Sequence, residues 1–198
     1  MIEFPKMFTS PTAVPSKPNF FNEGEVSKIL SQVNNLPYFK GILNGQESED
    51  NPKLSQTRKS SVKWIPQSEE WVWLWAKLVE EIQLVNSLYW RFKLSPIEDW
   101  VSIQYTEYNS NEEGHYDWHV DVGENVSSYR KVSCTIQLSS PEEYEGGDLQ
   151  VNTGKIETLP KDKGAICLFP SYILHRVTPV TRGIRKSLVL WVGGKPYS

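Results

Sequence analysis

Histidine is scarce in this sequence, so any histidine-based chemistry must draw on His115, His119 and His175. The first two lie in the run GHYDWHVDVG. On a β-strand, residues two apart project from the same face, so His119 and Asp121 would present an imidazole and a carboxylate side by side. A His-x-Asp pair alone is a weak signal, because it also arises as a hydrogen-bonded surface pair. Its meaning depends on what the rest of the chain brings to it.

The second half of a possible site lies in the run SYILHRVTPVTRGIRKSLVLWV. His175 ends an apolar, strand-like segment, and Arg185 enters another strand ten residues later. Alternation places Arg185 on the same face as Ser187, Val189 and Trp191. An arginine that points into a barrel needs an anionic partner, because a buried, unpaired guanidinium costs several kcal/mol. We therefore expect an anionic ligand beside Arg185, and Trp191 in the wall of the pocket that holds it.

Two histidines and one carboxylate form the facial triad of non-haem Fe(II) oxygenases, which leaves coordination positions open on the metal. A 2-oxo acid fills two of these positions and O2 fills the third. The distal carboxylate of such an acid suits the planar, two-pronged donor of Arg185, and Ser187 offers a further hydrogen bond. The candidate catalytic residues are therefore His119, Asp121, His175 and Arg185, and the first three are the candidate metal ligands.

Length and composition set the frame for this site. The 198 residues suit one domain over 1–198, with a lead-in and helical support over 1–100 and the catalytic core over 101–192. A net charge of −3, without a long basic run, gives no electrostatic footprint for nucleic acid, which is therefore an unlikely partner. No basic leader with an apolar stretch and no long apolar segment is present, so we expect neither a signal peptide nor a membrane span. Cys134 and Cys167 lie in apolar runs, which favours buried free thiols and a cytoplasmic setting.

Helical spacing is confined to the N-terminal half of the chain. The pattern from Asn22, the candidate N-cap, predicts a short amphipathic helix with Val26, Ile29, Leu30 and Val33 on one face. Ser68 opens a longer helix whose wide apolar stripe we interpret as core, not as a cofactor site. Its members are Trp71, Leu74, Trp75, Leu78, Ile82, Leu84 and Val85.

Two segments lack such periodicity. Residues 1–20, rich in proline, read as an extended lead-in that wraps the surface or pairs at a sheet edge. Residues 41–59 are polar and contain Gly, Asn and Pro, which predicts a long loop that moves or covers a site.

After Trp100 the period changes from helical to alternating, and short strand-like runs recur to the end of the chain. They read VSIQYTEY, RKVSCTIQLS, GDLQVNT, KIETLP, AICLFP, HRVTPV and RKSLVLWVG. Antiparallel hairpins with helices only upstream predict a mainly β (α+β) fold, a barrel or jelly roll supported by N-terminal helices.

The stretches LSSPEEYEGGDLQV and LPKDKGAICLFPSYILHRVTPVTRGIRKSLVLWV, with YDWHVD before them, resemble PKHD-type hydroxylases. These are relatives of prolyl 4-hydroxylase among the Fe(II)/2-oxoglutarate-dependent dioxygenases. The resemblance covers about residues 101–192, and RKSSVKWIP upstream agrees more loosely. It implies a double-stranded β-helix (cupin-like) fold, with Fe(II) held by His119, Asp121 and His175 and the distal carboxylate of 2-oxoglutarate held by Arg185.

The resemblance also implies O2 as co-substrate, ascorbate as a possible reductant, and a proline-containing peptide or protein as substrate. Related enzymes place a tyrosine before the His-x-Asp pair in contact with 2-oxoglutarate. Tyr108 or Tyr105 could match it, because the NSNEEG turn changes the spacing. The glycines of the GGDL run, Gly146 and Gly147, are expected to be architectural. Tyr116 and Trp118, which flank the metal pair, could line a substrate channel or simply pack in the core.

Three other functions compete with peptidyl-prolyl hydroxylation. The same oxygenase chemistry could act on a free amino acid, a small metabolite or a nucleobase, and a cupin-like barrel could bind a ligand without turnover. A zinc hydrolase would use His115 and His119, four apart on a helix. The residues around them favour a strand, and Tyr116 stands where a zinc protease would carry its catalytic glutamate, so we expect His115 not to bind the metal but to lie behind its ligands or on the surface.

Overall fold

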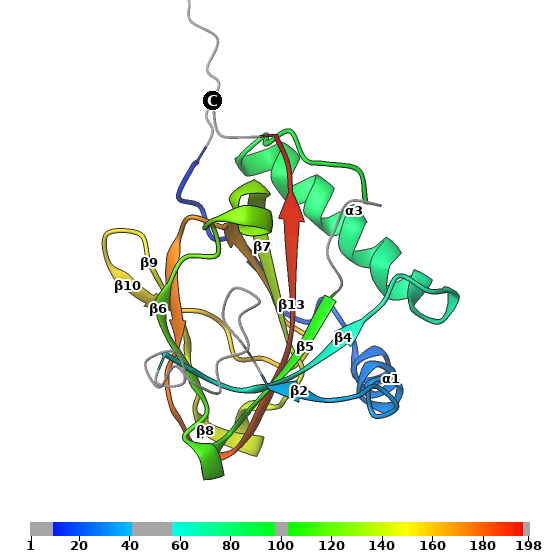
Figure 1. Ribbon diagram of the computed structural model, residues 1–198, viewed down its shortest axis with the longest axis vertical. Helices are drawn as coiled ribbons and strands as arrows, with labels where there is room; N and C mark the ends of the chain where they lie inside the picture. The colour runs from blue at the N-terminus through cyan, green and yellow to red at the C-terminus, as the bar shows by residue number, and fades with distance from the viewer. Residues whose placement is uncertain (1–9, 41–56, 98–102, 196–198) are drawn as a thin grey trace, which may run out of the picture.

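Two β-sheets face each other in the computed structural model, which describes residues 10–40, 57–97 and 103–195 (Figure 1). The larger sheet follows the order β1 (Ser16–Lys17), β11 (Ile166–Pro170), β7 (Arg130–Gln137), β13 (Val180–Gly193), β5 (Ile103–Asn109), β4 (Ser61–Ile65) and β2 (Phe39–Lys40), and β8 (Tyr144–Gly146) also pairs with β13. The smaller sheet follows the order β10 (Ile156–Thr158), β9 (Leu149–Asn152), β12 (Leu174–Val177), β6 (His115–His119) and β3 (Arg58–Lys59). The strand pairs of both sheets are antiparallel, as the sequence predicts.

The first helix, α1 (Glu23–Val33), begins where the sequence predicts. The side chain of Asn22 accepts a hydrogen bond from the backbone N–H of Glu25, and the Glu25 carboxylate accepts one from the backbone N–H of Asn22, both at 2.9 Å. This reciprocal capping box satisfies two amide groups that the first helical turn would leave unbonded. The helix buries Val26, Ile29 and Val33.

The second helix, α3 (Val72–Tyr89), follows a short 3-10 turn, η1 (Glu69–Trp71), so the α-helix starts later than predicted. The predicted stripe is buried except at Leu84, where the prediction is wrong, since 51% of that side chain is exposed. Two residues along a helix correspond to about 200° of rotation, so Leu84 points away from the face that carries Ile82 and Val85.

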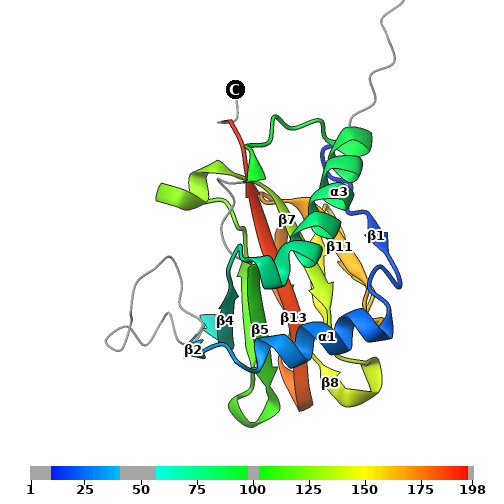
Figure 2. The same cartoon turned by 90° about the vertical axis from the view of Figure 1, so that its right-hand side faces the viewer.

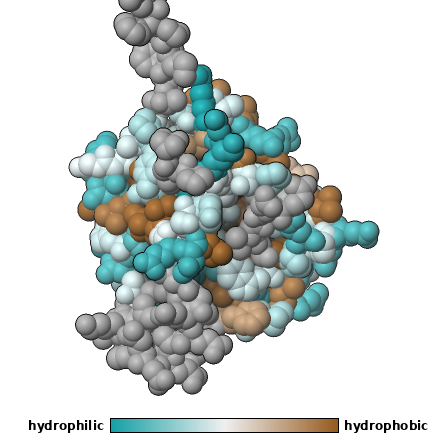
Figure 3. Space-filling model, turned by 45° about the horizontal axis from the view of Figure 1, so that its top comes forward, coloured by the Kyte–Doolittle hydropathy of each residue, from teal (hydrophilic) through white to brown (hydrophobic). Residues whose placement is uncertain are grey.

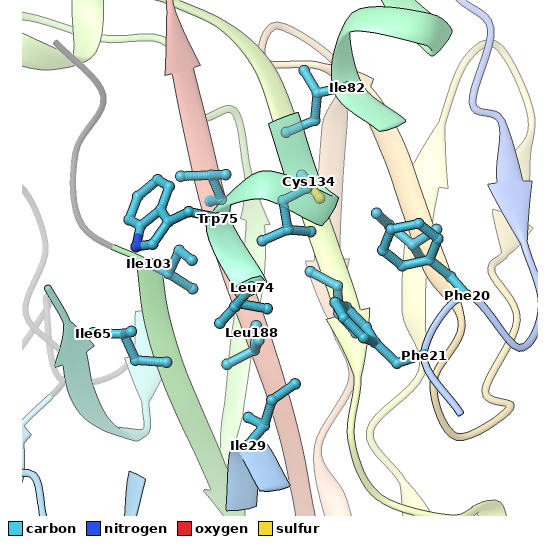
Figure 4. Close-up of a cluster of buried hydrophobic side chains, with 14 of the residues drawn as sticks. Phe20, Phe21, Ile29, Ile65, Leu74, Trp75, Ile82, Ile103, Cys134 and Leu188 are labelled. Atoms are coloured by element: carbon cyan, nitrogen blue, oxygen red, sulfur yellow. The ribbon is translucent and has the colours of Figure 1, made fainter. Parts of the chain in front are cut away.

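Both helices lie across the outer face of the larger sheet (Figure 2). Their apolar side chains meet those of the sheet in one cluster (Figure 4), in which Leu74 and Trp75 of α3 lie near Ile103 and Leu188. The cluster contains Cys134, which is buried and free, as is Cys167. The aromatic stripe is therefore core, as predicted.

The strands of the larger sheet present different residues to their two sides. On β13, Leu188, Leu190 and Val192 belong to the helix-covered cluster, whereas Arg185 and Trp191 line a cavity between the two sheets. The strand β7 repeats the pattern, with Cys134 and Ile136 outside and Ser133 and Thr135 at the cavity. Strict alternation thus builds an apolar outer layer and a polar inner layer from the same strands.

The remaining N-terminal segments extend the sheets at their edges. Residues 16–17 of the proline-rich lead-in form β1, which pairs with β11, so the predicted pairing at a sheet edge is confirmed there. The loop predicted over 41–59 lies mostly outside the described residues, and its end, Arg58–Lys59, forms β3 against β6. The strand β4 was not predicted, because its sequence SVKWI follows polar residues and is short.

The exterior mixes polar and apolar side chains. The face in Figure 3 interleaves hydrophilic and hydrophobic residues, and α3 exposes Val72, Leu84 and Leu88. Among the residues that the structure describes, no helix combines the length and apolar character needed to cross a bilayer.

Candidate metal centre

Three potential metal ligands converge at one end of the cavity. One donor atom from each of His119, Asp121 and His175 lies within 4.8 Å of the others. The Nε2 atom of His119 lies 3.7 Å from Oδ1 of Asp121, and Nε2 of His175 lies 3.4 Å from Oδ2. Two imidazole nitrogens and a carboxylate oxygen at such spacing suit a divalent metal ion.

The smaller sheet and the turn after β6 position these ligands. His119 ends β6 and pairs across the ladder with His175 of β12, so the two imidazoles are direct cross-strand neighbours. Asp121 lies beyond the end of β6, where its backbone N–H donates to the carbonyl of Ser171. The predicted convergence is present, but the turn supplies the carboxylate, and not the alternation of one strand.

Hydrogen bonds fix the orientation of each ligand. The Nδ1–H of His119 donates to the carbonyl of Asp117 at 2.7 Å, and that of His175 donates to the carbonyl of Ile173 at 2.9 Å. Since a carbonyl can only accept, each Nδ1 carries the proton and each Nε2 lone pair is left for a metal.

The carboxylate of Asp121 is held in the same way. The Ser133 hydroxyl donates to Oδ2 of Asp121 at 2.6 Å and lies 3.0 Å from the Ser171 hydroxyl, which then donates to Ser133. This short chain of hydroxyl groups leaves Oδ1 of Asp121 without a bond from Ser133.

The electrostatics of the triad also suit a metal. Burial and the neighbouring His175 lower the pKa of His119 to about 4. Burial opposes ionisation of Asp121, but the adjacent imidazoles and the Ser133 hydroxyl outweigh it and hold the pKa of the carboxyl below its usual value. At neutral pH the His119 imidazole is therefore neutral and the carboxylate is ionised, which are the forms that coordinate a cation.

A second charged group, Arg185, lines the same cavity and is only 4% exposed. Its Nη1 donates to the Ser187 hydroxyl at 3.2 Å, and it is hydrogen-bonded to the hydroxyl of Tyr144. That hydroxyl also accepts a bond from Nε2 of Gln137 at 2.9 Å. Within the described part of the chain no carboxylate pairs with Arg185, which leaves the guanidinium to an anion from outside.

One of the two glycines before β9, Gly147, makes room for this arginine. Gly146 and Gly147 have φ values of +70° and +60°, as expected for architectural glycines. A Cβ atom on Gly147 would lie 3.1 Å from Cδ of Arg185 and 2.9 Å from Cγ2 of Val180. Any larger residue at 147 would therefore press on the arginine.

The two candidate tyrosines lie on opposite faces of β5. Tyr108 lines the cavity, and its ring centroid lies 5.5 Å from Cζ of Arg185. Tyr105 belongs to the helix-covered cluster, and its hydroxyl donates to Glu107 at 2.5 Å. The structure thus corrects the inclusion of Tyr105 among the site residues, because three positions along a strand reverse the face.

Aromatic residues complete the wall. Trp191 lines the cavity as predicted. The ring of Tyr116 stacks on the imidazole of His119, with centroids 3.4 Å apart and an interplanar angle of 12°. Trp118 does not line the cavity and instead packs under the guanidinium of Arg176, at 4.6 Å.

A register shift explains why Tyr116 and His119 share a side although they are three residues apart. His119 pairs with His175 and Tyr116 pairs with Val177, so β6 carries one more residue than β12 between these pairs. Such a β-bulge changes the side on which the following residues project. Simple alternation along the sequence could not reveal it.

His115 lies outside the triad, as expected. It begins β6, so it does not share a helix with His119, and its Nδ1–H donates to the carbonyl of Glu113 at 2.7 Å. The helical arrangement that a zinc hydrolase would need is therefore absent at these two residues.

Four polar residues of the cavity were missed by sequence reasoning: Arg58, Gln104, Ser133 and Thr135. Arg58 follows the predicted loop and falls in the loosely matching RKSSVKWIP run. Gln104 precedes Tyr105 on β5, and side chains alternate along a strand, so the two project to opposite faces. This alternation in VSIQYTEY was the one signal in the sequence for the position of the Gln104 side chain.

Comparison with known proteins shows what this architecture is similar to. Residues 103–193 match the model of the 2OG-Fe(II) oxygenase superfamily. A PKHD-type hydroxylase from Janthinobacterium sp. (strain Marseille) is 42% identical over 85 residues, which cover 39% of this chain and 38% of that relative. The match therefore spans well under half of the relative's own length.

Solved structures extend the likeness over nearly the whole chain. A prolyl hydroxylase from Trichoplax adhaerens, in complex with a hypoxia inducible factor peptide fragment, has a TM-score of 0.75 at 18% identity, covering 92% of this chain and 84% of that one. A prolyl-4-hydroxylase from Pseudomonas putida has a TM-score of 0.68 at 19% identity, covering 93% and 94%. At this identity the likeness establishes the fold, the double-stranded β-helix that the sequence predicts. The match of residues 103–193 to the model of the 2OG-Fe(II) oxygenase superfamily, together with the identity to PKHD-type hydroxylases, confirms the predicted resemblance.

Proposed function

We propose that this chain is an Fe(II)- and 2-oxoglutarate-dependent hydroxylase. The observation that carries the proposal is the sharing of one cavity by the His119, Asp121 and His175 triad and the buried Arg185. The donor set fits Fe(II), because two neutral imidazoles and one carboxylate leave coordination positions open. When bound, Fe(II) and 2-oxoglutarate together activate O2 to convert a C–H bond into C–OH, with release of succinate and CO2.

The protein's own contribution is to hold and to orient. The triad would hold the metal, and Arg185 with Ser187 would hold the distal carboxylate of 2-oxoglutarate through charge-assisted hydrogen bonds. Tyr108 and Trp191 would form the wall beside the co-substrate. Leu149, Phe169 and Val177 line the same cavity and would exclude water from the reacting groups. None of these roles requires a nucleophile or a general base.

For the substrate we propose a prolyl residue in a peptide or protein. Support comes from the names of the relatives, which are PKHD-type hydroxylases, and from the Trichoplax adhaerens prolyl hydroxylase, which is bound to a peptide fragment. Ascorbate as reductant and a cytoplasmic location stay predictions from the resemblance and from composition.

The decisive experiment combines metal content with turnover. The variant His175→Ala loses an Nε2 ligand that nothing nearby replaces, so we expect it to bind no stoichiometric iron and to release no succinate from 2-oxoglutarate above background. The matched control is His115→Ala, which removes a histidine of the neighbouring strand outside the triad and should keep both properties. Iron measured by mass spectrometry and succinate measured by chromatography test the proposal; succinate formation by His175→Ala would exclude it.

A further inference from the structure

The cavity contains a second buried arginine, for which the proposed reaction has no use. Arg58 lines the cavity together with the triad and is 8% exposed. It lies on β3, directly across the ladder from Tyr116 of β6. Its guanidinium carbon lies 4.9 Å from the centroid of the Tyr116 ring.

Rigid partners hold this guanidinium. Its Nε–H donates to the Ser60 hydroxyl at 2.8 Å, and Nη2 donates to Oε1 of Gln104, also at 2.8 Å. Gln104 is itself fixed, because Oε1 accepts a second bond from Thr106 at 3.2 Å. The arginine is therefore pre-positioned, and an ion that it binds would not have to pay for ordering its side chain.

Arg58, which lines the cavity, has more N–H groups than its described hydrogen-bond partners use. A guanidinium carries five N–H donors, of which the bonds to Ser60 and Gln104 use two. Among the described residues no nitrogen of Arg58 is both enclosed and unbonded, and no carboxylate forms an ion pair with it. The one carboxylate in the cavity wall, Asp121, pairs instead with the two histidines.

Charge balance assigns Arg58 to a further ligand. The positive charges of Fe(II) and Arg185 would be cancelled by the negative charges of Asp121 and the 2-oxoglutarate dianion. Among the described residues nothing then compensates the charge of the Arg58 guanidinium, and a buried, uncompensated charge is an arrangement that proteins avoid unless an anion completes it. Both bound groups belong to the proposed function, so this step rests on it.

The stacking order fixes where that anion would sit. The His119 imidazole stacks on the Tyr116 ring with centroids 3.4 Å apart, and the guanidinium carbon of Arg58 lies 4.9 Å from the centroid of the same ring. Arg58 and a candidate metal ligand thus both contact one aromatic ring. A group bound to Arg58 and a carbon held at the metal would be joined by only a few bonds.

We propose that Arg58 is a substrate-recognition residue and that the substrate carries a carboxylate close to the carbon that is hydroxylated. The carboxylate can be a free α-carboxylate or an acidic side chain next to the target residue. Both sources present the same planar, two-oxygen acceptor, to which arginine is complementary.

Matched acids and amides test this directly. Calorimetry would measure their binding to the protein loaded with Fe(II) and 2-oxoglutarate without O2. The first pair is N-acetyl-L-proline and its amide, which reports an α-carboxylate. The other pairs are acetyl-Asp-Pro-amide with acetyl-Asn-Pro-amide, and acetyl-Pro-Asp-amide with acetyl-Pro-Asn-amide, which report a side-chain carboxylate.

In at least one pair we expect the acid to bind at least about 30-fold more tightly than its neutral partner, the range found when one member of a buried charge pair is removed. Arg58→Gln should abolish that preference. Arg58→Lys, which keeps the charge but loses the fork, should retain part of it. The control Lys59→Gln removes a charge from the same strand, where the side chain is bound to Glu113 outside the cavity, and should keep the full preference.

The proposal is overturned if no acid binds more tightly than its amide, whether both bind equally or neither binds. It is equally overturned if Arg58→Gln keeps the preference, or if both Arg58 variants lose affinity for 2-oxoglutarate while remaining folded. Iron-dependent binding of 2-oxoglutarate, measured separately, reports the proposed function through Arg185. Failure of that function is thereby distinguished from failure of the Arg58 assignment.

Discussion

The two faces of the larger sheet are built from the same strands but differ in what they carry. Along β13, Leu188, Leu190 and Val192 pack under the helices, whereas Arg185 and Ser187 face the cavity. The outer residues bury apolar surface against apolar neighbours, and this burial is the main source of folding free energy. The inner residues bury charge and hydrogen-bonding groups, which adds little or costs stability. Alternate residues of this one strand therefore serve two purposes: those on the outer side stabilise the fold, and those on the inner side line the candidate site.

The largest expected effect comes from the inner face, at Arg185. In Arg185→Gln we expect the Kd for 2-oxoglutarate to rise by about 30-fold or more, since losing one partner of a buried, charge-assisted pair costs about 2–5 kcal/mol. Calorimetry on the iron-loaded protein would measure it. Arg182→Gln is the matched control, because Arg182 lies on the same strand but is exposed and bonded to Glu145. An equal loss in both variants would argue against a specific role for Arg185.

The outer face should respond in the opposite way. Leu188 is fully buried beneath the helices, so Leu188→Ala should lower the free energy of unfolding by about 2–5 kcal/mol through lost burial and the cavity left behind. Affinity for 2-oxoglutarate, measured well below the melting temperature, should be unchanged. Denaturant titration and calorimetry on the same sample test both statements, and a large change in affinity would show that the two faces are not independent.

The smallest expected effect concerns two tyrosines on opposite faces of one strand, β5. Tyr108→Phe should weaken 2-oxoglutarate binding by about 5-fold, the equivalent of one hydrogen bond of ~1 kcal/mol. Tyr105→Phe should leave that binding unchanged and cost about 1 kcal/mol of stability, because its hydroxyl bonds to Glu107 on the helix side. The reverse result would restore Tyr105 as the candidate for co-substrate contact.

Much of this site could be predicted because strands alternate. The period of two placed Arg185, Ser187 and Trp191 on one side, and the cavity contains all three. The scarcity of histidine narrowed the metal ligands, and the triad converges as expected. The period of 3.6 placed α1 and most of the buried face of α3.

Other features depend on contacts between segments that are distant in the sequence, and local periodicity does not predict such contacts. Asp121 reaches the site from a turn held by Ser171, fifty residues further along the chain. Arg58 enters the cavity because β3 pairs with β6, although it follows a polar run that resembles a loop. The choice between Tyr105 and Tyr108 required knowing which face of β5 the helices cover.

The extra residue in β6 has a consequence for how this site can be changed. If the same residues paired regularly back from His119, the position opposite Val177 would fall to Asp117, and the Tyr116 ring would turn to the other side of the strand. Deleting Asp117 or Trp118 would instead remove the bulge and leave Tyr116 two residues from His119, still opposite Val177, so the stacked ring should survive the deletion. In the sequence as it stands, the bulge places a candidate metal ligand and the ring beside Arg58 on one side of a short strand.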